Sequence, residues 1–84
     1  MKHARKDYDR IQDPLNKIPD DEPVFLLRAK DQLAPALLKI WAHNLVVAGG
    51  QEEMAQLVSN HADRMIEWQH IHGCKIPDME FPQK

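Results

Sequence analysis

The sequence contains few of the residues that stabilise or activate a small protein by special chemistry. Cys74 is the only cysteine among its 84 residues, which excludes an intramolecular disulfide framework and a four-cysteine zinc site. No apolar run approaches the roughly 20 residues of a membrane-spanning helix, and no apolar signal-peptide region follows the charged N-terminus. The sequence therefore predicts a cytoplasmic protein without membrane contact.

Patterns that indicate catalysis are also missing. The chain has no glycine-rich phosphate loop, no GxSxG nucleophile elbow and no HExxH pattern. Cys74 has histidines nearby, but it lies in a proline-flanked tail that offers no obvious pocket or oxyanion donors. We therefore expect no catalytic residues, no enzyme activity and no cofactor.

The chain lacks a surplus of positive charge, because its formal net charge is -2 at pH 7. Proteins that coat nucleic acids need a clear excess of lysine and arginine, so this balance counts against nucleic acid as a partner. Hydrophobic residues make up 43% of the chain and charged residues 29%, which is typical of a soluble globular protein and not of a disordered one.

The sequence predicts one small domain, 1–84. A basic segment and a proline-containing loop occupy 1–23, the core follows over 24–73, and a tail covers 74–84. A single core in a chain of this length is only marginally sufficient for stability. Self-association is therefore expected.

Two short elements should precede the core helices. Ala4, Tyr8 and Ile11 recur at helical spacing, which predicts a short helix over 2–12 that ends before a proline. The apolar run VFLLRA, 24–29, favours a short extended segment. Periodicity alone leaves open whether this run is a strand or a buried helical turn.

A mainly α fold built on an antiparallel helical hairpin is the main prediction. Pro35 suits the first helical turn and Gly49-Gly50 stop the run, which places the first helix at about 34–48. The second helix is expected at about 51–72, with Gly73 after its end. The expected contact joins apolar residues at spacings of 3 and 4, namely Leu37, Trp41 and Leu45 on one helix and Met54, Val58, Met65 and Trp68 on the other.

The first helix is apolar nearly all round, so one hairpin partner cannot cover it. Its remaining apolar surface should be covered by the N-terminal segment, by VFLLRA, or by a second copy of the chain. We expect a homo-oligomer.

The opening stretch KHARKDYDRIQDP gathers two lysines, two arginines and a tyrosine. In a helix, Lys2, Lys6 and Arg10 form a stripe that repels itself and becomes favourable when an anion sits on it. Arg5 can donate bidentate hydrogen bonds to a phosphate, and Tyr8 can stack on a base. The alternative is that Arg5 pairs with a neighbouring aspartate and Tyr8 packs inward, because most surface charge only keeps a protein in solution.

Arg28 and Lys30 lie beside VFLLRA and share one face if the segment is a strand. They could then join the N-terminal cations around a phosphate. The alternative is a salt bridge from Arg28 to the acidic loop Asp20-Asp21-Glu22. That loop has oxygen ligands for a cation, but its spacing matches no ion-binding loop.

The segment HIHGC places His70, His72 and Cys74 close together at a helix end. Ligands two residues apart can share an ion only where the backbone turns or extends. Histidines near a helix C-terminus are more simply explained by the helix dipole. We therefore expect no metal site.

The chain resembles a group of small proteins encoded by tailed phages and prophages, for which no activity is established. The resemblance is carried by HARKDYDRIQDP, by IPDDEPVFLLRAKD with AP shortly after, by Trp41-Ala42, and by WQ and KIPD near the end. Membership implies a phage or bacterial cytosolic setting. Small phage proteins outside the virion commonly bind something in the host, including defence proteins and the nucleotide signals of defence systems.

These features together predict a non-enzymatic, phage-encoded sponge. It would sequester a cyclic oligonucleotide or related phosphate-bearing signal in pockets assembled at the subunit interfaces of an oligomer. The expected ligand-binding residues are Arg5, Lys6, Tyr8, Arg10, Arg28 and Lys30. The alternatives are a protein-protein inhibitor or adaptor acting on a host defence protein, and a small DNA-associated regulator with its N-terminal arm on the backbone.

Overall fold

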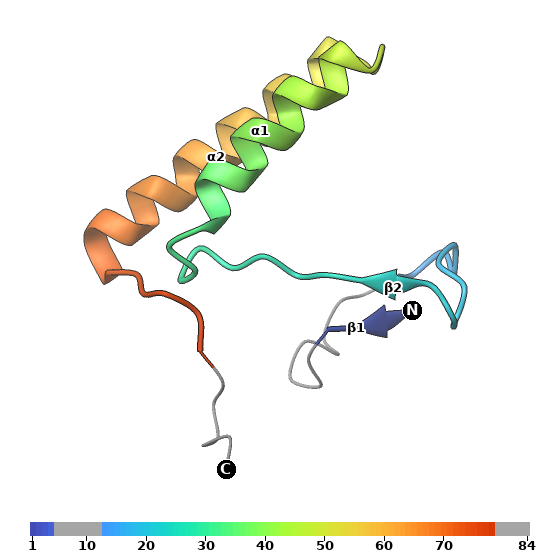
Figure 1. Cartoon of the computed structure of the whole chain (residues 1–84), viewed down its shortest axis with the longest axis horizontal. Coiled ribbons are helices and arrows are strands. Elements are labelled where there is room, and N and C mark those ends of the chain that lie inside the picture. Colours follow the sequence, from blue (N-terminus) through green and yellow to red (C-terminus); the bar gives the residue numbers. More distant parts are fainter. Residues whose placement is uncertain (5–12, 79–84) are drawn as a thin grey trace.

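The computed structural model of the chain describes residues 1–4 and 13–78. The two helices form a long antiparallel hairpin, and a linker runs from the base of the hairpin to a small pair of strands (Figure 1). The fold is mainly α, as expected, with its largest contact between the two helices. The elements in the described part are β1 (Lys2–His3), β2 (Pro23–Val24), α1 (Ala34–Val47) and α2 (Glu52–His72).

Helix α1 begins and ends within one residue of the predicted bounds. Pro35 stands in the first turn, where its missing N–H is not needed. The Asp31 Oδ1 atom accepts a hydrogen bond from the Leu33 N–H at 2.8 Å, just before the helix. Gly49, with a φ of +89°, follows the helix in a conformation that favours glycine.

The connection between the helices requires a second glycine for a different reason. A Cβ on Gly50 would lie 2.7 Å from the Leu45 Cγ atom and 2.9 Å from the Leu45 carbonyl oxygen. The same carbonyl accepts the Gly50 N–H at 2.8 Å, so the close approach is part of the turn. Helix α2 ends at His72 and is capped by Gly73, whose φ is +83° and whose N–H bonds to the Gln69 carbonyl at 2.7 Å.

The contact between the helices differs from the predicted one. The hydrophobic residues that are buried are Ala34, Ala42, Ala55 and Ala62, with exposed fractions of 0, 5, 7 and 0%. Leu37, Trp41, Met54 and Trp68 were expected in the contact, but they are 38–48% exposed. We define the inner seam as the less exposed positions at spacings of 3 and 4 that face the other helix: Pro35, Leu38, Ala42 and Leu45 of α1, and Ala55, Val58, Ala62, Met65 and Gln69 of α2.

The inner seam is rotated from the prediction because alanines occupy its centre. Small side chains allow two helix backbones to approach closely, and large side chains then lie beside the contact instead of within it. Leu45, Val58 and Met65 belong to both the predicted and the observed seam. The prediction was therefore right about the pairing of the helices and wrong about the faces they present.

The strands also correct the prediction for the N-terminus. Lys2 pairs with Pro23 and His3 with Val24 in a parallel ladder, so a helix does not begin at Lys2. The remainder of the predicted helix over 2–12 lies outside the described residues, apart from Ala4. Of the run VFLLRA only Val24 is in a strand, and Phe25 is 66% exposed.

The described N-terminal elements, β1 and β2, do not cover the hairpin. The linker extends away from the helix pair toward the strands (Figure 1), and Leu37 and Ile40 of α1 remain 48% and 56% exposed. Among residues 1–4 and 13–78, no helix combines the length and apolar character needed to cross a membrane.

Candidate functional site

The two predicted ligand residues that the structure describes, Arg28 and Lys30, lie in the linker just before α1. Arg28 is exposed and Lys30 is half-buried. The Arg28 carbonyl accepts the Asp31 N–H at 3.0 Å, so these cations occupy the first and third positions of a turn. The strand alternation that was expected to align them does not apply here, because β2 ends at Val24.

The backbone of this turn is fixed by α2 and by the tail. The Gln69 side-chain amide donates to the carbonyls of Ala29 at 2.9 Å and Asp31 at 3.1 Å. The Lys75 N–H donates to the Lys30 carbonyl at 3.0 Å. We call these three contacts the Gln69 clasp. The clasp gives Lys30 a defined backbone position even though no regular element contains it.

Neither cation has an anionic partner in the part of the chain that the structure describes. The predicted alternative, a salt bridge from Arg28 to Asp20-Asp21-Glu22, is not formed among these residues. With respect to residues 1–4 and 13–78, both side chains are available to an anion. A guanidinium forms bidentate hydrogen bonds to a phosphate, and an ammonium acts as a point charge beside it.

Four further predicted ligand residues, Arg5, Lys6, Tyr8 and Arg10, lie outside the described residues. Lys2 was assigned to a helical cationic stripe with two of them, and this assignment is wrong for Lys2 because it lies in β1. The strand ladder and the bond from the Lys2 N–H to the Glu22 carbonyl at 2.6 Å place the start of the chain beside β2. That the start of the chain pairs with β2, just before the segment with Arg28, was not predicted, since strand pairing between distant residues leaves no local signal.

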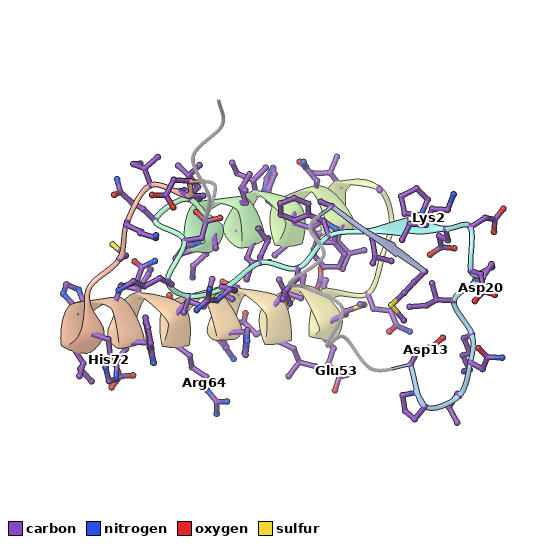
Figure 2. The ribbon with its side chains drawn as sticks, turned by 90° about the horizontal axis from the view of Figure 1, so that it is seen from below. Lys2, Asp13, Asp20, Glu53, Arg64 and His72 are labelled. Carbon is purple, nitrogen blue, oxygen red and sulfur yellow. The ribbon has the colours of Figure 1, made fainter. Side chains whose placement is uncertain are left out.

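The two regions considered for metal binding lie far apart. Figure 2 places Asp20 and His72 at opposite ends of the molecule. The His72 ring packs on Trp68 with a centroid distance of 4.5 Å, and Cys74 is exposed. Within residues 1–4 and 13–78, no three histidine, cysteine or carboxylate side chains gather as metal ligands would.

A shallow groove of about 490 Å³ lies along α2 beside α1. It is lined by Leu38, Leu57, Val58, Asn60, His61 and Arg64. Figure 2 shows the Arg64 side chain extending from α2 on the side away from α1. The sequence analysis did not predict this groove. The spacing of Leu57, His61 and Arg64, which share one helix face, was the signal available.

A polar contact between the helices was also missed. The Lys39 Nζ atom lies 2.8 Å from the Ser59 Oγ atom and 2.8 Å from the Asp63 Oδ1 atom. Lys39 is the only charged residue of α1, and it is directed toward α2. The sequence signal for this contact was a single lysine in an otherwise uncharged helix.

Comparisons of the chain with protein-family models, with curated proteins and with solved structures find no match. The function is therefore inferred from the geometry and chemistry of this chain.

Proposed function

We propose that the protein is a non-enzymatic binding protein that sequesters a phosphate-bearing nucleotide signal. The signal would be a cyclic oligonucleotide or a related messenger of a bacterial defence system, and the setting the cytoplasm of a phage-infected bacterium. The observation that carries the proposal is the pair Arg28 and Lys30, two cations on one fixed turn that have no anionic partner among the described residues.

The chemistry of this turn suits a phosphate. Two like charges two residues apart repel each other, and an anion between them relieves the repulsion. The Gln69 clasp holds the backbone before the ligand arrives, so less ordering accompanies binding. Charge-assisted hydrogen bonds to a phosphate are about twice as strong as neutral ones.

The N-terminal cations would complete the site. Arg5, Lys6 and Arg10 would contact further phosphate oxygens, and Tyr8 would stack on a base. These groups bind and orient a ligand without breaking a bond in it. Pockets shared between subunits of a homo-oligomer would hold a ligand with several phosphates from more than one side.

Isothermal titration calorimetry with cyclic dinucleotides, cyclic trinucleotides and NAD-derived signals tests the proposal. We expect at least one of these to bind the natural protein. Arg28→Gln should weaken that binding about 10- to 100-fold, because a hydrogen bond to a charged group contributes about 1.5–3 kcal/mol. Arg64→Gln removes the same charge from α2 and should leave the affinity within about threefold.

The absence of heat with every nucleotide, in a sample whose helicity is confirmed by circular dichroism, would refute the proposal. Equal losses from Arg28→Gln and Arg64→Gln would show that only the overall charge matters. The site would then not be at the turn.

A protein-protein inhibitor or adaptor acting on a host defence protein is the second candidate. Solvent-exposed apolar side chains on α2 favour this candidate, notably Leu57 and Ile71, which are 66% and 71% exposed. A pull-down from host lysate with the tagged natural protein separates the candidates. A stoichiometric protein partner that Leu57→Glu abolishes would support the adaptor, whereas a sponge brings down no such partner.

A further inference from the structure

Helix α1 carries a second apolar seam on the side away from α2. Leu33, at the helix N-cap, is followed at spacings of 4, 3, 4 and 3 by Leu37, Ile40, Asn44 and Val47. At about 100° per residue these five positions lie within about 40° of one line along the helix. We call them the outer seam. The inner seam of α1 lies on the opposite side of the helix.

The outer seam is in water in the isolated chain. Leu33, Leu37, Ile40 and Val47 are 50, 48, 56 and 73% exposed. Trp41, beside the seam, is 45% exposed. A helix face that is meant for solvent carries charged side chains, and the outer seam carries none.

The second helix provides the contrast. The exposed positions of α2 include Glu52, Glu53, Asp63, Arg64 and Glu67. The only charged residue of α1, Lys39, is already paired with Asp63. The exposed positions of α2 therefore mix charged residues with apolar ones such as Leu57 and Ile71, whereas the outer seam of α1 carries no charge.

We infer that the outer seam is the contact surface for a second copy of this chain, with α1 packed on α1. A repeat of apolar residues at alternating spacings of 3 and 4 is the pattern by which two helices pack side by side. Two hairpins joined in this way place four helices in one assembly. The resulting core would combine both outer seams with the two inner seams on either side.

The area required for such a contact is present. The whole chain has an accessible surface of 7031 Å². A compact monomer of 9.8 kDa exposes about 5,200 Å². The difference is spread over the whole chain, the extended linker included (Figure 1), and is larger than the roughly 800 Å² that each partner contributes to a stable interface.

The small size of the side chains buried in the monomer explains why the contact would be permanent. The residues that are buried in the two helices are four alanines and Pro35. Such small side chains remove little apolar surface from water, so the hairpin depends on a partner that is always present. A second copy is present wherever the chain is, and the fraction associated rises with the concentration of the chain. An uncharged face also meets its own copy without repulsion between like charges.

Asn44 gives the outer seam a means of fixing its alignment. It is the one polar residue of the five. A single asparagine in an apolar helix contact restricts register and oligomeric state, because its amide needs a hydrogen-bonding partner across the contact. Asparagine both donates and accepts, so the same residue of a second copy is a suitable partner.

Ile40 is the test position, since it is the middle residue of the outer seam. In either relative orientation of two α1 helices that pack about their centres, Ile40 lies near its counterpart. We expect the natural protein to be an oligomer by light scattering coupled to size exclusion. Ile40→Glu and Ile40→Lys should each weaken self-association by about 100-fold or more, because each buries a charge without a partner.

A mixture of the Ile40→Glu and Ile40→Lys proteins should recover association to within about tenfold of the natural protein, since opposite charges then meet. This mixture keeps the test meaningful even if each variant alone is unfolded. Leu57→Glu is the matched control: it places the same charge at an exposed apolar position of α2 and should leave the oligomer intact.

A natural protein that is monomeric over a wide range of concentrations would overturn the inference. So would an oligomer that Ile40→Glu leaves intact, one that Leu57→Glu dissociates instead, or charge variants that do not recover on mixing. None of these measurements involves a nucleotide, so their failure is distinct from failure of the proposed function.

Discussion

Replacing Ala62 with leucine tests the contact between the helices directly. Ala62 is 0% exposed and lies in the inner seam opposite α1, where Ala42 is 5% exposed. Ala62→Leu puts an isobutyl group where the structure has room for a methyl. The helices must then separate, or the side chain must adopt a strained rotamer.

The expected cost is about 1–3 kcal/mol, the usual range for overpacking a close helix contact. For a chain of 84 residues, each kcal/mol lowers the melting temperature by about 4–8 °C. Ala62→Leu should therefore melt about 5–20 °C below the natural protein. The measurement is thermal unfolding by circular dichroism at one fixed protein concentration, because association contributes to stability.

Two comparisons make this prediction specific to the inner seam. Gln56→Leu adds a leucine at an exposed position of the same helix and should shift the melting temperature little. Trp68→Ala removes a residue that spacing alone placed in the contact, but its 38% exposure predicts a smaller loss than complete burial would. An unchanged melting temperature for Ala62→Leu, together with a large loss for Trp68→Ala, would show that the helices meet on the originally predicted face.

Two further predictions concern the turns. Gln69→Leu keeps the size of the side chain but leaves the carbonyls of Ala29 and Asp31 without their donor, so it should destabilise the protein by about 1–3 kcal/mol in urea unfolding. An unchanged urea midpoint would show that the Gln69 clasp does not hold the turn. Gly50→Ala should cost about 1–3 kcal/mol in the same assay, because the new methyl lies 2.9 Å from the Leu45 carbonyl oxygen. An unchanged urea midpoint for Gly50→Ala would mean that the turn between the helices can widen to hold the methyl group without loss of stability.

The bounds of both helices could be predicted from the sequence because their signals are local. Pro35 in a first turn and Gly49 and Gly73 beyond the last turns act through backbone conformations that depend on few neighbours. The faces by which the two helices contact each other were predicted less well. Alanine scores weakly as an apolar residue, so the spacing of large residues dominated the prediction, while the positions that permit close approach, Ala55 and Ala62, were overlooked.

The geometry of the candidate site could be predicted from the sequence less well than the bounds of the helices. That Arg28 and Lys30 lie together followed from their closeness in the chain. Their turn, however, depends on Gln69 and Lys75, which lie far away in sequence and act through backbone carbonyls. Gln69 and Lys75 lie in the short segments WQ and KIPD, and the clasp gives both segments a physical role.

The outer seam and the proposed ligand turn are close in the chain, which connects the two proposals. Leu33 begins the seam, three residues after Lys30, and the Leu33 N–H is bonded to the side chain of Asp31, the last residue of the turn. A second copy packed on Leu33 would therefore approach the linker that carries Lys30. If the ligand contacts both copies there, binding and association must strengthen each other to the same extent, because the two equilibria are linked. Sedimentation of Ile40→Glu with and without a bound cyclic nucleotide measures this coupling. Recovery of the oligomer by the nucleotide would place the ligand between subunits, whereas full binding by the dissociated variant would place the site within a single chain.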